Sequence, residues 1–171
     1  RITRAELELD SVERGGLRRM RWSRRLREVP SRIWSDDEWR RLQLGYRAGA
    51  MEEKWNVFAE GQTVFCHRSW TGLGYFEVTF ALVEGGGWRI SSGKVARDRS
   101  DLLTRLLPGR RRHSDAFNLV LLELVLSGIV LGEPAAELRA KLNELVRKQS
   151  PAPDDIPDGF AEHVFRGQRS E

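Results

Sequence analysis

The segment from Lys54 to Val95 constrains the fold more than any other part of this chain of 171 residues. It is rich in aromatic and β-branched residues, and turn residues interrupt it at regular intervals, which is typical of strands. We expect strands near residues 54–59, 62–70, 75–84 and 88–95. Their connections, at Glu60-Gly61, Thr71–Gly74 and Gly85–Gly87, are short, so the four strands should form one antiparallel meander.

Pairing across the loop Thr71–Gly74 predicts which side chains share a face of this sheet. If Trp70 faces Tyr75, then Arg68 faces Glu77, and opposite charges and aromatic rings form cross-strand pairs. One face would then carry Trp55, Val57, Phe65, His67, Phe76, Val78 and Phe80, and the other Cys66, Arg68, Glu77 and Thr79.

Helices are expected before the sheet. Thr3 and Glu6 form a possible capping box, and the basic segment 17–29 spaces Leu17, Met20 and Leu26 as a helix would, up to Pro30. A stronger signal is Ser35 followed by Glu38, a capping box that Trp34 and Trp39 can close as a hydrophobic staple. That helix should end at Gly45.

The last third also predicts helices. They span residues 99–107, then a segment from Ser114 or Asp115 to Leu131 that is apolar nearly all round, then a helix after Glu133-Pro134. The expected fold is therefore α+β, a four-stranded antiparallel meander flanked by N-terminal helices and a C-terminal apolar helical pair. We divide it into a basic helical extension (1–30), a core domain (31–149) and a Pro- and Asp-rich tail (150–171).

The composition indicates the cellular compartment and the classes of partner to expect. Cys66 is the only cysteine, so no internal disulfide or multi-cysteine zinc site can form, and a cytoplasmic location is expected. No stretch is long and apolar enough to span a membrane, so we expect a soluble protein. The net charge of +4 arises in residues 1–50, where 13 basic and 8 acidic residues give 13 − 8 = +5.

This basic segment fits either a surface that attracts phosphate groups or a solvated helix face. No established nucleic-acid motif of basic and aromatic residues accompanies it, so nucleic acid comes last among the expected partners without being excluded, after an anionic small molecule and a protein.

Catalytic signatures are absent from the sequence. It has no P-loop, dinucleotide-binding glycine motif, nucleophile elbow or zinc-protease motif, and Gly85–Gly87 joins two strands. The three histidines, His67, His113 and His163, share no ligand spacing, so neither a metal nor a cofactor is predicted.

The densest polar cluster is the segment His67–Gly72. Arg68 could hold a phosphate or carboxylate in its planar fork, and Trp70 could stack on a base. In a purely structural interpretation, Arg68 pairs with Glu77, Trp70 anchors the core, and His67 donates to a carbonyl group. The candidate ligand-binding residues are Lys54, His67, Arg68, Ser69, Trp70 and Glu77.

Two motifs carry a family resemblance. Met51-Glu52-Glu53-Lys54-Trp55 and His67-Arg68-Ser69-Trp70-Thr71-Gly72, together with the leucine-rich helix that ends at Gly132, resemble a family of small, uncharacterised bacterial proteins. The resemblance covers roughly residues 34–135. It implies a loose association with ADP-ribose- and NAD-linked genes, and no catalytic role.

Three functions follow as hypotheses. The first is an accessory module that binds a phosphate-bearing ligand, such as a nucleotide or an ADP-ribose-like molecule. The second is a small hydrolase or transferase that uses His67 with Glu77 or Glu53, which requires His67 to face an accessible cleft. The third is an antitoxin- or immunity-like interaction module that uses the basic N-terminal segment and the acidic tail.

Overall fold

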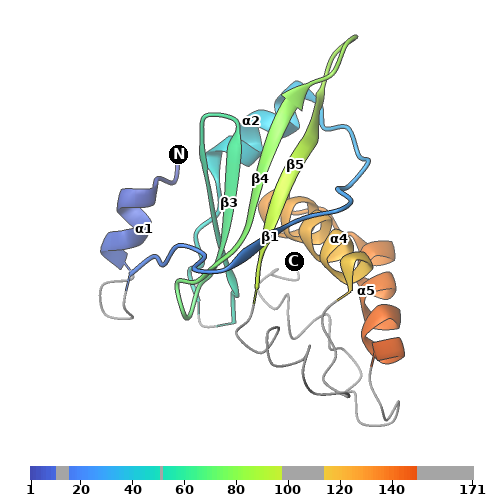
Figure 1. The fold of residues 1–171 in the computed structure, drawn as a ribbon. Helices are drawn as coiled ribbons and strands as arrows, with labels where there is room; N and C mark the ends of the chain where they lie inside the picture. Colours follow the sequence, from blue (N-terminus) through green and yellow to red (C-terminus); the bar gives the residue numbers. More distant parts are fainter. Residues whose placement is uncertain (11–15, 51, 98–113, 150–171) are drawn as a thin grey trace.

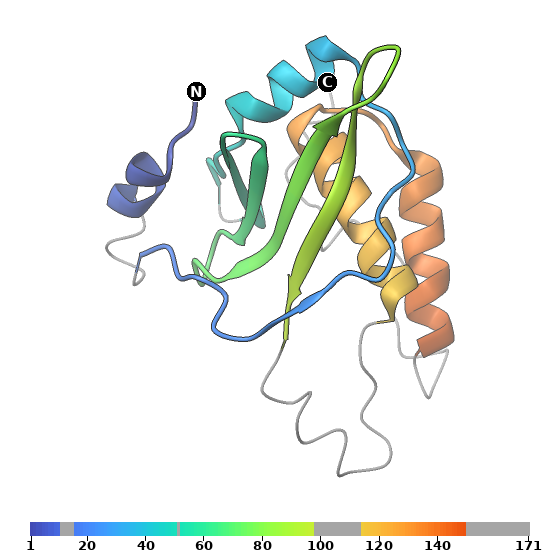
Figure 2. The same ribbon diagram turned by 45° about the horizontal axis from the view of Figure 1, so that its top comes forward.

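The computed structural model describes residues 1–10, 16–50, 52–97 and 114–149. Its strands form one antiparallel sheet; α2, α4 and α5 cover one face, and α1 lies against the other beside β2 and β3 (Figure 1, Figure 2). The α+β prediction is therefore confirmed. The elements are α1 (Arg4–Asp10), β1 (Ser23–Arg25), α2 (Asp36–Leu44), β2 (Trp55–Glu60), β3 (Thr63–Arg68), β4 (Gly74–Leu82), β5 (Trp88–Ala96), α4 (Asp115–Leu124), the π-helical segment η2 (Val125–Val130) and α5 (Ala136–Gln149).

The four predicted strands are present, but the described sheet has five strands in the order β1-β5-β4-β3-β2. The extra strand, β1, lies within the segment 17–29, so the predicted helix there is wrong. The side chains alternate: Arg24 pairs with Asp115 of α4 at 2.6 Å, whereas Arg25 points to the opposite face. Leu26 lies two residues after Arg24 and is buried in the core. Gly93 of β5 leaves room for it, because a Cβ at Gly93 would lie 2.9 Å from the Leu26 Cδ1.

The predicted pairing of β3 with β4 is also wrong. The predicted partner of Phe65 is Phe80, and the observed partner is Glu77, three positions earlier. Because side chains alternate with a period of two, this odd shift exchanges the faces of β3. Cys66 therefore points into the core and lies opposite Phe76, and Phe65 points away. The register shifts again between Cys66 and His67, where the ladder is irregular.

Helix α2 begins as predicted. The Ser35 side chain accepts from the amide of Glu38, and the Glu38 carboxylate accepts from the amide of Ser35, which satisfies amides that the first turn leaves unpaired. Trp34 and Trp39 are both buried and both contact the Phe80 ring, at 5.3 and 4.6 Å between ring centres. These contacts fix α2 on the sheet.

The apolar helix is present in two parts. α4 is capped by Ser114, whose side chain accepts from the amide of Phe117, and it continues into η2 after Leu124. Its buried side chains, with those of β2 to β5, form the core on the helix-covered face. The predicted helix 99–107 and the tail 150–171 lie outside the described residues. In the described part of the chain, no helix has the length and apolarity needed to cross a membrane.

Candidate functional site

The candidate site lies where β3 leaves the sheet. The amide of Arg68 donates to the carbonyl of Leu73 at 2.9 Å, and the amide of Gly72 donates to the carbonyl of Arg68 at 2.9 Å. Gly72 has φ 66°, a left-handed conformation that glycine adopts at little cost. The chain therefore turns within a few residues, and the loop that follows Arg68 is held by its own backbone.

His67 has a structural role in this turn. Its side chain is 3% exposed, and Nδ1 donates to the carbonyl of Gly72 at 2.9 Å. Its ring lies 5.5 Å from that of Phe58, on the face of the sheet that α1 adjoins, so the predicted placement beside Phe76 and Val78 is wrong. Burial lowers the pKa of His67, which keeps the imidazole neutral.

Arg68 lies on the other face, directly opposite Trp55 of β2. Its guanidinium carbon is 4.7 Å from the centre of the Trp55 ring, and Tyr75 meets the same ring edge-on at 5.4 Å. Burial lowers the pKa of Arg68. No hydrogen bond or ion pair joins the guanidinium to a described residue, and the predicted pair with Glu77 does not form.

Lys54 and Trp70 are close to Trp55 and Arg68 along the chain: Lys54 precedes Trp55, and Trp70 follows Ser69, the residue after Arg68. The amide of Ser69 donates to the carbonyl of Lys54 at 3.0 Å, and the Ser69 hydroxyl donates to the carbonyl of Glu53 at 2.6 Å. These bonds fix Ser69 as a structural residue and place the Lys54 ammonium 5.4 Å from the Trp70 ring. Trp70 is 50% exposed, so it is not the core anchor of the structural interpretation.

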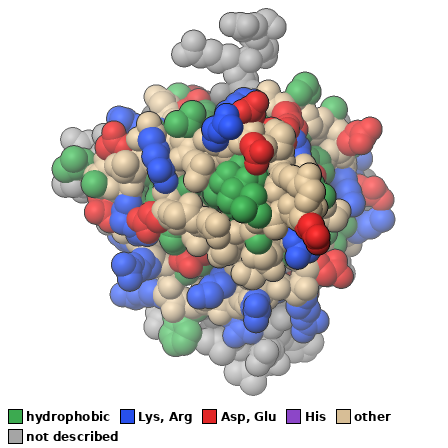
Figure 3. All heavy atoms as spheres, turned by 90° about the horizontal axis from the view of Figure 1, so that it is seen from above, with side chains coloured by type: hydrophobic (Ala, Val, Ile, Leu, Met, Phe, Trp, Pro, Cys, Tyr) green, Lys and Arg blue, Asp and Glu red, His purple; other side chains and the backbone are tan. Residues whose placement is uncertain are grey.

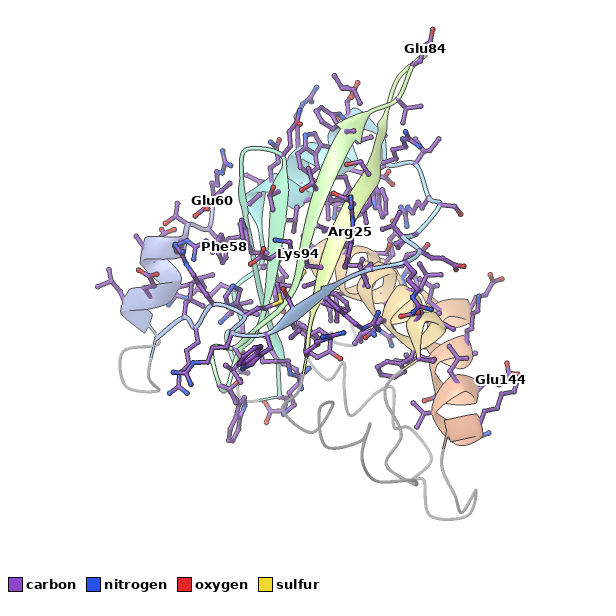
Figure 4. All side chains as sticks on the ribbon, in the orientation of Figure 1. Arg25, Phe58, Glu60, Glu84, Lys94 and Glu144 are labelled. Atoms are coloured by element: carbon purple, nitrogen blue, oxygen red, sulfur yellow. The ribbon has the colours of Figure 1, made fainter. Side chains whose placement is uncertain are left out.

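Glu77 belongs to a separate surface on the far side of the sheet. It lines a shallow hollow of about 600 Å³ together with Arg25 and Lys94. Arg25 and Lys94 lie opposite each other on the neighbouring strands β1 and β5 (Figure 4). Three hydroxyl groups of Thr63, Thr79 and Ser92 line the same hollow. The structure therefore brings Lys54 and Trp70 together, places Arg68 on the Trp55 ring, buries His67 and Ser69 in structural roles, and puts Glu77 in a separate hollow.

The basic segment before β1 also reaches this site, which the sequence did not predict. Arg18 forms a bridge to Leu73: its amide donates to the carbonyl of Gly72, and its carbonyl accepts from the amide of Gly74, both at 2.8 Å. The two glycines are the sequence signal for this contact, because a Cβ at Gly72 would collide with the carbonyl oxygen of Gly16, and one at Gly74 would lie 3.1 Å from the Met20 side chain.

The described residues provide neither a cluster of metal ligands nor an accessible thiol. Within the described ranges, no three potential ligand side chains of His, Cys, Asp and Glu gather in one place. Cys66 is fully buried, and burial raises the pKa of its thiol to about 12, so it is a poor nucleophile in the folded protein.

Comparison with known proteins adds no family, relative or structural neighbour. No protein-family model matches the chain, and neither does any curated protein or solved structure. The family resemblance drawn from the two motifs therefore stays a prediction, and function has to be inferred from the residues of the site themselves.

Proposed function

We propose that this protein is a non-catalytic module that binds a phosphate-bearing ligand through Arg68, with Lys54 and Trp70 as neighbouring contacts. Nucleotides and ADP-ribose are the ligands to test first, because the resemblance points to them and because each joins a phosphate to a flat base.

The half-buried guanidinium of Arg68, which forms no hydrogen bond or ion pair with a described residue, carries this proposal. Withdrawing a cation from water costs free energy unless an opposite charge offsets it, and here the lowered pKa reports that uncompensated cost. The Trp55 ring stabilises the cation through its π face but accepts no hydrogen bond along the guanidinium fork. A phosphate oxygen pair matches that fork in charge and geometry.

Lys54 and Trp70 supply the rest of a nucleotide site. The Lys54 ammonium, which lies over the Trp70 ring, provides a second cation for a diphosphate. The half-exposed Trp70 indole provides a flat surface on which a base can stack, with about 1–3 kcal/mol expected per stacked base. These three side chains thus offer one contact for each part of a nucleotide.

The hydrolase alternative has less support. It requires His67 in an accessible cleft, whereas the ring is buried against Phe58 and its Nδ1 is used by the carbonyl of Gly72. Its proposed partner Glu77 lies on the same face of the sheet and acts on His67 electrostatically, but the hydrogen bond that His67 makes to a described residue goes to the carbonyl of Gly72 and not to Glu77.

A thermal-shift titration with ADP, ADP-ribose and inorganic pyrophosphate tests the proposal. A ligand at a hundredfold excess over its Kd should stabilise the protein by about 2.7 kcal/mol, which is a rise of several degrees in Tm. Arg68→Gln should abolish the rise. Arg40→Gln is the matched control, because Arg40 is an exposed arginine on α2 that pairs with Asp37 of its own helix.

The outcomes separate clearly. A rise in Tm that Arg68→Gln removes and Arg40→Gln preserves supports the site. An absence of any rise with all three anions at millimolar concentration contradicts the proposed function, and a rise that survives Arg68→Gln contradicts the role of this residue.

A further inference from the structure

A second set of exposed groups lies at the same end of the sheet, where β2 and β4 begin and β3 and β5 end. We call this surface the basic end. Its members are Arg18, Arg21, Trp22, Lys54, Arg68, Trp70 and Leu73.

Backbone contacts hold the two halves of the basic end together. The bridge from Arg18 to Leu73 fixes the N-terminal segment against the loop that follows β3. Four residues later, the carbonyl of Trp22 accepts from the amide of Arg97 at 2.7 Å, just after the end of β5. The segment therefore crosses the end of the sheet from the β3–β4 loop to β5, and its side chains cannot move far from Trp70.

Three large hydrophobic side chains are exposed on this surface. Trp22 is 57% exposed, Trp70 50% and Leu73 44%. Burying such side chains would lower the free energy of the protein. Apolar side chains that cluster on the surface therefore often mark a site of interaction. Two exposed indoles at one end of a small domain indicate a contact surface for flat or apolar groups.

Positive charge surrounds these side chains. Arg18 and Arg21 are exposed and form no ion pair with a described residue. Lys54 directly follows Glu52 and Glu53, and the Glu53 carboxylate accepts from the amides of Gly49 and Ala50. Arg18, Arg21, Lys54 and Arg68 give this surface four cationic side chains, which favour contact with a polyanion.

The opposite end of the molecule differs in its charge. It carries the β4–β5 hairpin, with Glu84 at its tip (Figure 4). Seen from that end, a small hydrophobic patch is surrounded by side chains of both charges (Figure 3). Exposed residues at this opposite end therefore provide control substitutions, because they are of similar type to those of the basic end but lie outside it.

We infer that the basic end binds single-stranded nucleic acid, which deepens the proposed function by naming a polynucleotide as the phosphate-bearing ligand. In sequence, cations and rings interleave here: Arg18 and Arg21 precede Trp22, and Arg68 precedes Trp70. Single strands are bound by such alternation, with bases on aromatic rings and phosphates on the cations between them. A membrane-binding surface instead separates an apolar face from a basic one.

Fluorescence anisotropy of the full chain with a labelled single-stranded deoxythymidine dodecamer tests this inference. The dodecamer should bind at least tenfold more tightly than ADP. Its affinity should fall with salt with a logarithmic slope of about −3, for four phosphate contacts at about −0.7 each. Arg18→Gln combined with Arg21→Gln should reduce the slope to about half of that.

Separate variants distinguish this inference from the proposed function. Trp22→Ala should weaken dodecamer binding about tenfold and leave ADP binding unchanged, while Arg68→Gln should weaken both. Leu82→Ser and Arg40→Gln, at the opposite end, should change neither. Thermal unfolding of each variant confirms that it folds.

The remaining outcomes overturn one claim or both. Equal affinity for ADP and the dodecamer, or a dodecamer affinity that Trp22→Ala leaves unchanged, contradicts the inference but not the proposed function. Binding of neither ligand contradicts both. Binding to phosphatidylserine vesicles without binding to the dodecamer identifies a membrane surface and overturns the inference, as does tighter binding to a duplex of the same length.

Discussion

The guanidinium of Arg32 holds the carboxylate of Glu133 through two hydrogen bonds of 2.6 and 2.8 Å. This bidentate pair joins the segment before α2 to the connection between η2 and α5, a separation of 101 residues in sequence. The same guanidinium donates to Glu38 at 2.9 Å and to Ser127 at 2.8 Å, and it lies over the Trp34 ring. Arg32 therefore fastens the α2 capping box to the helical layer.

We predict that this pair makes stability fall in acid. Hydrogen bonding to Arg32 holds the pKa of Glu133 below its ordinary value, so the folded state prefers the ionised carboxylate. The stabilisation is complete above the unfolded pKa of about 4.5 and is lost as pH falls through the folded pKa. Glu133→Gln should cost about 1 kcal/mol near neutral pH and should flatten the acid limb of a urea-unfolding curve measured against pH.

Glu144→Gln is the control for that measurement. Glu144 also has a pKa lowered by a hydrogen bond, to Lys148, but both side chains are exposed on α5. Solvent screens such a pair, so the substitution should leave the curve unchanged. An equal effect of the two substitutions would show that Arg32 gives Glu133 no special role.

A second prediction concerns Arg68 without ligand. Arg68→Met keeps an unbranched side chain on the Trp55 ring and removes a cation that no described residue pairs with. The variant should be more stable than the parent by about 1 kcal/mol in urea unfolding, because a buried charge is lost and no partner is left behind. Arg24→Met should have the opposite sign, since it leaves Asp115 without its 2.6 Å partner. Destabilisation by Arg68→Met would assign Arg68 a structural role.

The elements that the sequence predicted well are those specified by local contacts. Ser35 and Glu38 satisfy each other's amides within one helical turn, so the start of α2 follows from neighbouring residues alone. The four predicted strands likewise follow from their own composition and turns. Such signals need no knowledge of distant parts of the chain.

The elements that the sequence did not predict depend on distant partners. Symmetric pairing about Thr71–Gly74 assumed that β3 continues to Trp70, whereas the chain turns after Arg68 and His67 lies opposite Gly74. β1 likewise forms because β5 offers an edge and Gly93 offers space for Leu26, neither of which is visible within residues 17–29. The prediction that Glu77 belongs to the candidate site was wrong for the same reason. Glu77 lies opposite Phe65 and not opposite Arg68, a difference of three residues in register.

A third prediction tests the attachment of the N-terminal segment. Gly72 has φ 66°, and a Cβ there would collide with the carbonyl oxygen of Gly16. Gly72→Ala should therefore cost the left-handed strain of about 1 kcal/mol and, in addition, displace the segment from the loop. Hydrogen exchange of the Gly74 amide, which donates to Arg18, should become faster.

Gly61→Ala is the matched control for this substitution. Gly61 has φ 59° in the β2–β3 turn, and a Cβ there would meet only open space. It should show the conformational cost alone, about 1 kcal/mol. Equal losses of stability for the two variants would mean that the contact with Gly16 adds nothing.

The final prediction concerns the thiol of Cys66. The side chain is completely buried between Val57 and Phe76, its register partners on β2 and β4, and burial raises its pKa to about 12. Reaction with a disulfide reagent needs an accessible thiolate, so the folded protein should not react and modification should proceed only through opening of the sheet. Its rate should then rise with urea in proportion to the population of the open state. A Ser31→Cys variant made in a Cys66→Ala background, with the thiol at an exposed position, should react at a rate that urea hardly changes. Rapid labelling of Cys66 without urea would show that β3 leaves the sheet readily, and with it the turn that positions Arg68.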